Sequence, residues 1–234
     1  MTPKPYPKST LREYFETIVI SVIIVLFTKT FVFQHFKIPT GSMERTLLIG
    51  DHLMVNRYIY RKESLPLLDK VLPTRDVRRG DVVVFKWPDD PRKDFIKRVI
   101  GIPGDTLELR QDVIYVNGRS QEEPYKWLDP ARVREGRLYF ESRMRTAGPY
   151  VVPPDKYFLM GDNRYNSQDS RFWNQTFARR DEIKGRALFV WWSYEGPQNI
   201  EPNVPYQVRI RDFAKMLVNF PVKTRWSRSF TMVH

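Results

Sequence analysis

The stretch "GDVVVFKWPDDPRKDFIKRVIGIPGD", residues 80–105, holds two apolar runs that are separated by prolines and aspartates. The first run covers residues 82–87 after a Gly-Asp pair, and the second covers residues 94–102 and ends at Pro-Gly-Asp. Short runs of β-branched and aromatic residues between such turn residues are typical of β-strands. The stretch therefore predicts two strands of a sheet.

The same pattern continues outward on both sides of this stretch. Further runs occupy residues 52–60, 112–116, 156–160 and 187–193. Asn117-Gly118, which follows the second of these runs, is a strong signal for a type I′ hairpin turn. The last run is apolar throughout, which is typical of a strand buried on both faces. We therefore expect a mainly β fold, with Trp191 and Trp192 buried in the sheet.

Two segments depart from the strand pattern. A charged stretch with several prolines and glycines, at about residues 110–156, predicts a small insertion between two halves of the sheet. Near the C-terminus, residues 208–220 fit an amphipathic helix. With these additions, we expect residues 34–234 to form one folded unit.

The longest apolar stretch lies near the N-terminus and reads "YFETIVISVIIVLFTKTFVF", residues 14–33. About 20 predominantly apolar residues cross a bilayer as a helix, and a lysine near the helix end, such as Lys29, can reach the headgroups. A core helix and a cleaved signal peptide are the alternatives, but no small-x-small processing site follows the stretch. We expect an uncleaved transmembrane anchor, with a cytoplasmic tail at residues 1–13 and residues 34–234 on the outer face.

Composition excludes several kinds of chemistry. The chain has no cysteine, and its three histidines, His35, His52 and His234, lie far apart, so neither a thiolate site nor a zinc site is expected. The net charge is +12, but Lys and Arg are spread along the chain without a nucleic-acid motif. The charge therefore fits anionic lipid or solubility as well as it fits nucleic acid. Any catalysis must use Ser, Thr, Lys, Asp, Glu or Arg.

Ser42 lies in the segment "FKIPTGSMERTL", residues 36–47, just after the apolar stretch. Gly41 before it lets the backbone approach a ligand closely, and Pro39 stiffens the chain. Taken alone, Ser42 also fits an ordinary helix N-cap, which is the commoner role of such a serine.

Lys97 lies in the second apolar run, next to Arg98, so two cations stand within a predicted strand. On a strand, Lys97 shares a face with Phe95 and Val99, while Arg98 shares the other face with apolar neighbours. We expect one of these two cations to leave the core. If Lys97 is the buried one, desolvation lowers its pKa from about 10.4 and makes it a base. The alternative is a lysine whose ammonium reaches solvent from an edge strand.

A third polar segment, "GDNRYNSQDSRFW", covers residues 161–173. Such a segment between strands is normally a loop held by its own side-chain hydrogen bonds. A serine nucleophile without a histidine needs another base, however, and a lysine base needs polar neighbours to orient it. The three segments together therefore indicate chemistry that none of them indicates alone.

Taken together, these segments resemble the bacterial type I signal peptidases, or leader peptidases, which are membrane-anchored Ser-Lys endopeptidases. The resemblance lies in "IPTGSMERTLLIGD" (38–51), "RRGDVVVFKWP" (78–88), "FIKRVIGIPGD" (95–105), "GDNRYNSQDSR" (161–171) and "GRALFVWWS" (185–193), in the family's order. It implies an antiparallel, barrel-like β catalytic domain that follows one transmembrane helix.

The resemblance also implies roles for individual residues. Ser42 would be the nucleophile and Lys97 the general base, while Thr40 and the Ser42 N–H would form the oxyanion hole. The supporting residues would be Ser167, which orients the lysine, and the pair Asp169 and Arg171, which braces the loop. Tyr165 departs from the family, where aspartate is common. Two shallow pockets for small residues would be lined by Phe36, Ile38, Met43, Leu47, Leu53, Val84 and Ile96, although each of these also fits plain core.

The function implied is removal of N-terminal signal peptides from exported preproteins by cleavage after small residues (Ala-x-Ala). No cofactor or metal is implied, and the partners are signal peptides and membrane lipid, anionic lipid included. We expect a monomer that crosses the cytoplasmic (inner) membrane once, with its catalytic domain on the periplasmic or outer face. Two alternatives stay open: a self-cleaving repressor-like Ser-Lys protease, and a non-enzymatic membrane-anchored β-domain that binds anionic partners.

Overall fold

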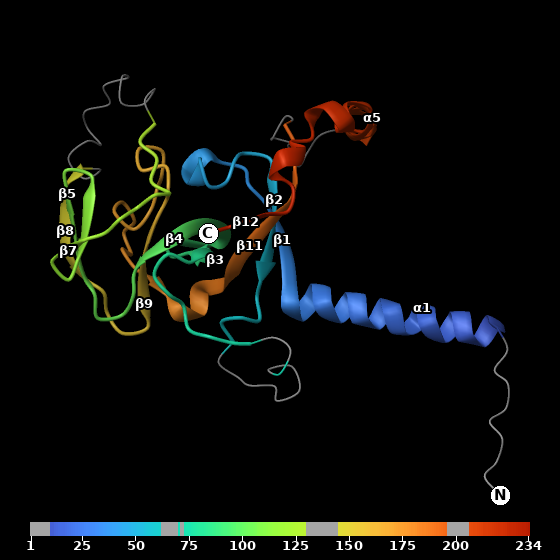
Figure 1. The fold of residues 1–234 in the computed structure, drawn as a ribbon, viewed down its shortest axis with the longest axis horizontal. Coiled ribbons are helices and arrows are strands. Elements are labelled where there is room, and N and C mark those ends of the chain that lie inside the picture. The colour runs from blue at the N-terminus through green and yellow to red at the C-terminus, as the bar shows by residue number, and fades with distance from the viewer. Residues whose placement is uncertain (1–9, 62–69, 71–72, 130–144, 196–205) are drawn as a thin grey trace, which may run out of the picture.

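A large antiparallel sheet forms the centre of the computed structural model, which describes residues 10–61, 70, 73–129, 145–195 and 206–234 (Figure 1). Its strand order is β1-β2-β11-β3-β4-β9-β10, and β12 pairs with β11. The strands are β1 (Phe33–Lys37), β2 (Asp51–Asn56), β3 (Val82–Trp87), β4 (Asp90–Gly101), β9 (Lys156–Met160), β10 (Ala178–Arg179), β11 (Ile183–Ser193) and β12 (Thr231–Met232). The fold is therefore mainly β, as predicted.

A smaller antiparallel sheet of order β7-β6-β5-β8 branches from the large one. Its strands are β5 (Thr106–Arg110), β6 (Val113–Val116), β7 (Arg119–Ser120) and β8 (Ala147–Val151). The chain leaves the large sheet after β4 and returns at β9, and these two strands pair directly, with Val99 opposite Leu159. The small sheet thus lies on the stretch for which the sequence predicts an insertion, of which residues 130–144 are outside the described part.

Most of the predicted strands are confirmed. The runs at residues 82–87, 94–102 and 156–160 correspond to β3, β4 and β9. Between β6 and β7, Asn117 and Gly118 have φ angles of 51° and 77°. Positive φ at both central residues is what a type I′ turn requires, so the hairpin is confirmed as well.

The prediction that residues 187–193 are buried on both faces is wrong. Ala187 and Val190 are buried, but Trp191 and Trp192 are only half-buried. The pairing of β11 with β2 is irregular at two points, which interrupts the alternation of the faces. The outer face carries an aromatic cluster, in which the Trp192 ring stacks on His52 at 4.7 Å between centroids.

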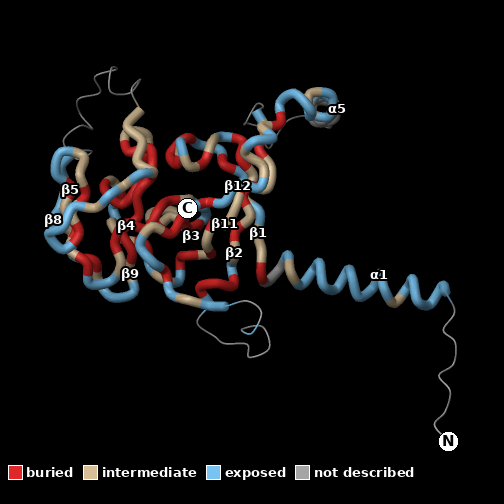
Figure 2. The backbone as a smooth tube through the Cα atoms, in the orientation of Figure 1, coloured by how far each residue is buried: buried red, intermediate tan, exposed pale blue. Residues whose placement is uncertain are grey.

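The N-terminal helix α1 (Thr10–Phe27) begins before the predicted span and ends earlier. A π-helical turn (Thr28–Val32) follows it, and β1 then pairs with β2, with Phe33 opposite Asn56. Val32 is buried and Phe33 belongs to the sheet, so the sheet begins at the last residue of the predicted span. No residue of α1 is buried, and Figure 2 shows the helix projecting from the sheets.

Among the described residues, no helix is both long enough and apolar enough to cross a bilayer.

The apolar core covers both faces of the central strands. Val83 and Phe85 of β3 belong to one cluster with Val99 and Leu159. Val82 and Val84, which point to the other face, belong to a second cluster. A third cluster joins the small sheet to Ile100, Phe158 and Met160. Because β3 and β4 have apolar cover on both sides, polar groups on either face of these strands are removed from water.

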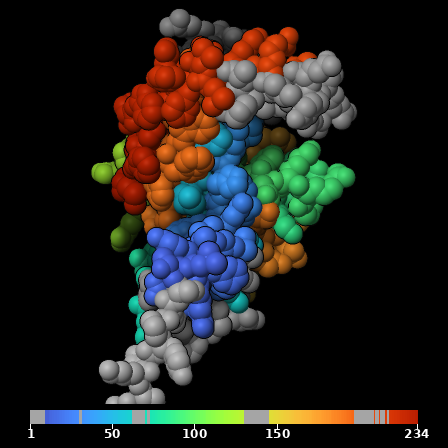
Figure 3. Space-filling model, turned by 90° about the vertical axis from the view of Figure 1, so that its right-hand side faces the viewer, coloured from blue at the N-terminus to red at the C-terminus, as the bar shows by residue number. Residues whose placement is uncertain are grey.

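The predicted C-terminal helix is confirmed as α5 (Tyr206–Lys223). Leu217, Val218 and Val222 on this helix are exposed. Figure 3 shows α5 on the same side of the molecule as α1.

Candidate active site

Ser42 is buried in a 3₁₀ turn (Gly41–Met43) that follows extended Thr40. The N-cap of this turn is Thr40 and not Ser42, so the capping alternative for Ser42 is wrong. The Ser42 Oγ atom lies 2.7 Å from Nζ of Lys97, and its carbonyl oxygen accepts a hydrogen bond from the Asn163 N–H at 3.1 Å. The turn therefore aims the hydroxyl at the lysine and is held by the loop at residues 161–171.

Lys97 of β4 is buried, with 4% of its surface exposed. Its Nζ atom donates to the Ile96 carbonyl at 3.0 Å and lies 5.4 Å from the centre of the Phe95 ring. Burial lowers the pKa of Lys97 to about 8, although the carboxylates of Asp169 and Asp162 act in the opposite direction. The alternative of a lysine reaching solvent is thus wrong.

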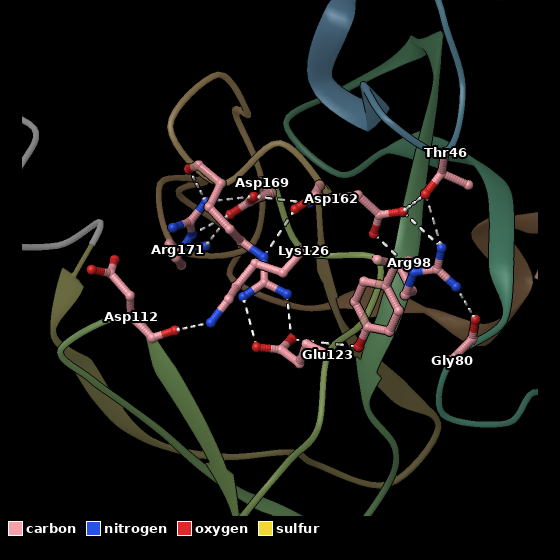
Figure 4. A network of polar contacts seen from close by, with 12 residues as sticks. Thr46, Gly80, Arg98, Asp112, Glu123, Lys126, Asp162, Asp169 and Arg171 are labelled. Carbon is pink, nitrogen blue, oxygen red and sulfur yellow. Dashed lines mark hydrogen bonds and ion pairs between the residues drawn. The ribbon is translucent and has the colours of Figure 1, made fainter. Parts of the chain in front are cut away.

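Arg98, the next residue, is buried as well, with 1% of its surface exposed. The prediction that one of the two cations leaves the core is wrong because β4 is covered on both faces. Arg98 donates to both carboxylate oxygens of Asp162, at 2.8 and 2.7 Å, and its Nη1 atom donates to the Gly80 carbonyl (Figure 4). The same Nη1 atom also donates to the His234 carbonyl. A buried cation is tolerated where such partners replace water.

The loop at residues 161–171 is braced by a second buried ion pair. Arg171 donates from Nε and Nη2 to Asp169, at 2.8 and 2.9 Å, and also bonds the Arg164 carbonyl. The Gly161 N–H donates to the same carboxylate at 3.1 Å. Burial by itself would raise the pKa of Asp169, but Arg171 beside it lowers that pKa overall. The Asp169 carboxylate is therefore a fixed negative charge that acts on the Lys97 amine.

Ser167 is buried at the site, but its hydroxyl makes no hydrogen bond to Lys97. Its hydroxyl is near the Asp169 carboxylate, but Oγ completes no hydrogen bond of normal geometry with any described residue. A Cβ atom placed on Gly161 would lie 2.3 Å from Ser167 Oγ and 2.4 Å from the Ser42 carbonyl oxygen. Ser167 and Ser42 thus meet at Gly161, while an orienting role of Ser167 toward the lysine stays a prediction.

Thr40 is exposed and extended, with φ −134° and ψ 155°, and its side chain does not cap the turn. Its role in the oxyanion hole also stays a prediction.

The seven predicted pocket residues all belong to one apolar cluster. Five of them are buried by 98% or more, namely Ile38, Met43, Leu47, Leu53 and Val84, which also fits the alternative of plain core. Phe36 and Ile96 are partly exposed and are the members that reach the surface. Val233, from the C-terminal end, joins the cluster although nothing in the sequence pattern pointed to it.

The segment at residues 123–127 is a part of the site that sequence reasoning missed. Glu123 forms a buried ion pair with Arg164. Arg98 stacks on the Tyr125 ring at 3.9 Å, and the Trp127 N–H donates to the Asp162 carbonyl at 2.8 Å. Only the crowding of arginines in the active-site motifs hinted that further acidic partners were needed.

Two further observations complete the site. Tyr165, which departs from the predicted pattern, donates from its hydroxyl to Asp112 of the small sheet at 3.1 Å. Within the described part of the chain, no group of three or more His, Asp or Glu side chains could hold a metal ion.

Comparison with known proteins assigns the family. The family model described as "Signal peptidase, peptidase S26" matches residues 11–192. The chain belongs to this family. It is a serine endopeptidase of the signal peptidase I type, and its substrates are signal peptides. Family membership rules out the repressor-like protease and the non-enzymatic β-domain.

Two relatives in sequence agree with the family assignment, and one solved structure was also matched. The signal peptidase I of Pseudomonas aeruginosa is 37% identical over 213 residues, which cover 80% of this chain and 75% of the relative. The signal peptidase I P of Bacillus subtilis subsp. natto is 33% identical over 187 residues, covering 80% and 91%. A crystal structure of a signal peptidase I from Enterococcus faecalis is 30% identical, with a TM-score of 0.38 over 48% of this chain and 97% of that one.

Proposed function

We propose that this peptidase cleaves after small residues with Ser42 as nucleophile and Lys97 as general base. The observation that carries the proposal is the 2.7 Å contact between Ser42 Oγ and the Nζ atom of a buried lysine. A serine hydroxyl is a weak nucleophile until an adjacent base accepts its proton. With a pKa of about 8, roughly one tenth of Lys97 is neutral at pH 7 and can act as that base.

The reaction then proceeds in two halves. Ser42 Oγ attacks the scissile carbonyl while its proton passes to Lys97 Nζ, and the lysine returns the proton to the leaving amine as the C–N bond breaks. Water, deprotonated by the same lysine, attacks the acyl ester and releases the signal peptide. Lys97 is thus the base in each half of the reaction and the acid for each leaving group.

The developing oxyanion would be bound by the Thr40 hydroxyl and the Ser42 N–H. Thr40 supports this role because it is exposed beside the turn and its hydroxyl does not serve as a cap. Loss of one oxyanion donor costs about 100- to 1000-fold in turnover in a comparable serine protease. Thr40→Val should therefore lose activity on this scale, while Thr40→Ser should keep it, and an active Thr40→Val enzyme would contradict the assignment.

The residues before the cut would bind as an extended strand beside Phe36 and Ile96. These side chains are partly exposed at the surface of the apolar cluster, and backbone pairing of this kind leaves alternate side chains to be read by pockets. The buried members Ile38, Met43, Leu47, Leu53 and Val84 would leave room only for small residues. Ser167 would orient the lysine once substrate is bound.

The chain would be attached to the cytoplasmic membrane as a monomer, with residues 1–13 inside, residues 14–33 as anchor and residues 34–234 on the outer face. The large apolar side chains of α1 are exposed, among them Ile18, Ile23 and Leu26. Helix α5, which exposes Val218 and Val222, lies on the same side of the molecule (Figure 3). Residues 214–234 carry four Lys or Arg and no Asp or Glu, which suits anionic lipid.

Cleavage of a fluorogenic Ala-x-Ala peptide in detergent tests the proposal. Ser42→Ala and Lys97→Ala should each lose about 10⁴-fold or more in kcat. Lys93→Ala is the matched control, because Lys93 lies on the same strand but is exposed. A Lys97→Ala enzyme with the activity of the control would show that another group is the base.

A further inference from the structure

A concave surface adjoins the turn that carries Ser42. It is a cleft of about 500 Å³ lined by Glu44, Arg45, Leu48, Trp127 and Asp129. Glu44 and Arg45 follow the nucleophile by two and three residues, and Trp127 and Asp129 come from the segment that joins the small sheet to the active site. None of the five lining residues belongs to the apolar cluster that supports the small-residue pockets.

Backbone hydrogen bonds fix this cleft relative to the nucleophile. The Asn163 N–H donates to the Ser42 carbonyl at 3.1 Å, and the Arg164 N–H donates to the Trp127 carbonyl at 2.9 Å. The turn at Ser42, the loop at residues 161–171 and the segment at residues 123–129 therefore lie side by side. Figure 4 shows the neighbouring Glu123 and Lys126 against this loop.

Arg45 joins the two walls of the cleft. Its Nη1 atom reaches the Lys126 carbonyl at 3.4 Å, and its guanidinium carbon lies 5.8 Å from the centre of the Trp127 ring. Arg45 also has a φ of 81°, a left-handed conformation that is unfavourable for a residue with a side chain. Strain of this kind persists where surrounding contacts enforce it, and it concentrates at ligand-binding sites.

We propose that this cleft binds the first residues after the scissile bond, the amino-terminal end of the mature protein. The inference rests on the proposed function, in which the residues before the cut occupy the apolar side. A peptide that passes Ser42 must leave on another side, and this cleft begins two residues beyond Ser42. Its occupant is an extended peptide that packs on the Trp127 ring and Leu48.

Glu44 gives the cleft a specific chemical task at its inner end. Its carboxylate accepts a hydrogen bond from the Asn163 side chain at 3.0 Å, and it lies 3.0 Å from where a Cβ atom on Gly41 would be. The Glu44 carboxylate is thus held next to Gly41, the residue before the nucleophile. The proton that returns from Lys97 completes a neutral amine at the new amino terminus. This amine takes a further proton from solvent to become an ammonium, and Glu44 is placed to receive that charge.

Two peptides that share the residues before the cut test the inference. The short peptide ends as an amide after the first residue past the scissile bond, and the long peptide continues for five residues. Trp127→Ala should lower kcat/KM for the long peptide about tenfold, mainly by raising KM. A tenfold loss is the usual scale for the removal of one aromatic contact. The short peptide should change less than about twofold. Trp127→Phe should restore most of the loss.

The controls separate recognition from folding. Trp127 holds the loop through its backbone, so truncating the side chain leaves these hydrogen bonds in place. Trp226→Ala removes an exposed tryptophan outside the cleft and should change neither peptide. Should Trp127→Ala fail to fold, Leu48→Ala makes the same distinction, because Leu48 also lines the cleft, with a loss for the long peptide only.

Equal losses for both peptides, or no loss for either, would overturn the inference while leaving the proposed catalysis intact. A wild-type enzyme that cleaves neither peptide would instead refute the proposed function, and this inference with it.

Discussion

Lys97 and Arg98 are neighbours on one strand, yet burial affects them in different ways. Arg98 bonds a carboxylate partner, whereas Lys97 faces a serine, a carbonyl and an aromatic ring. An amine can release its proton at accessible pH and a guanidinium cannot. Lys97 is thus the one of these two cations that can act as a base.

The pH dependence of kcat/KM should follow the protonation of Lys97. Burial lowers its pKa to about 8, so activity should rise about tenfold per pH unit below that value and level off above it. The measurement is kcat/KM from pH 6 to 10 on one Ala-x-Ala peptide. An acid limb near 10.4, the value of a free lysine, would contradict the burial argument.

Replacing Lys97 by methionine should stabilise the fold while abolishing activity. Burial lowers the pKa of Lys97 from 10.5 to about 8, which corresponds to about 3 kcal/mol in the free energy of unfolding. The fold is less stable by this amount below pH 8, where the buried amine is charged. Lys97→Met should unfold at higher temperature at pH 7, and its advantage should shrink as the pH rises from 8 to 10.5. Lys93→Met, on the exposed part of the strand, should show no such pH-dependent gain.

At the level of elements, the loop at residues 161–171 meets the 3₁₀ turn at Gly161, where no side chain fits. A Cβ atom there would lie 2.4 Å from the Ser42 carbonyl oxygen, so Gly161→Ala should displace the nucleophile. A misplacement of about 1 Å can cost about 100-fold in rate. We expect a folded enzyme with kcat reduced on that scale.

Gly104→Ala is the matched control for this loop variant. Gly104 has a φ of +87°, and a Cβ atom added to it would have no neighbour within 4 Å, so alanine adds backbone strain without a clash. It should lower the melting temperature and leave kcat unchanged. Equal kcat losses in the two variants would show that general destabilisation, and not the contact with Ser42, explains the result.

The elements themselves could largely be predicted from the sequence. Turn residues such as Asn117-Gly118 mark the strand ends, because few other residues adopt the required φ. Strand β1 was missed because Phe33 continues an apolar run that began in the helix. The partner of Phe33 is Asn56, more than twenty residues away, and no local pattern reports such a pairing. The same holds for Trp127 beside Asp162.

For the whole molecule, Arg98 is the group that joins distant parts of the chain. It links β4 to Gly80 before β3, to Asp162 after β9 and to His234 beyond β12. Alternation along β4 predicted that only one of its two cations could be buried. That prediction was wrong because the periodicity of one segment does not show how many layers cover the strand. Long-range packing therefore decides the surroundings of the active site.

Asp162→Asn should destabilise the whole fold by about 3–5 kcal/mol, because it leaves the buried Arg98 cation without its counter-charge. Asp90→Asn is the control, since the partners of Asp90, Arg92 and Lys93, are exposed, and thermal unfolding should change little. Unfolding of both variants in detergent checks the difference. Similar melting temperatures would show that the remaining partners of Arg98 suffice.

The direct pairing of β4 with β9 has a consequence for how this protein can diverge over evolution. The chain leaves the large sheet at Gly101 and returns opposite it, at Phe158, so the ends of the intervening stretch are already together. Each doubling of a connection's length then costs only about 0.6 kcal/mol. Insertions and deletions among descendants of this gene should accumulate here, on either side of the segment at residues 123–129, whose length the active site holds constant.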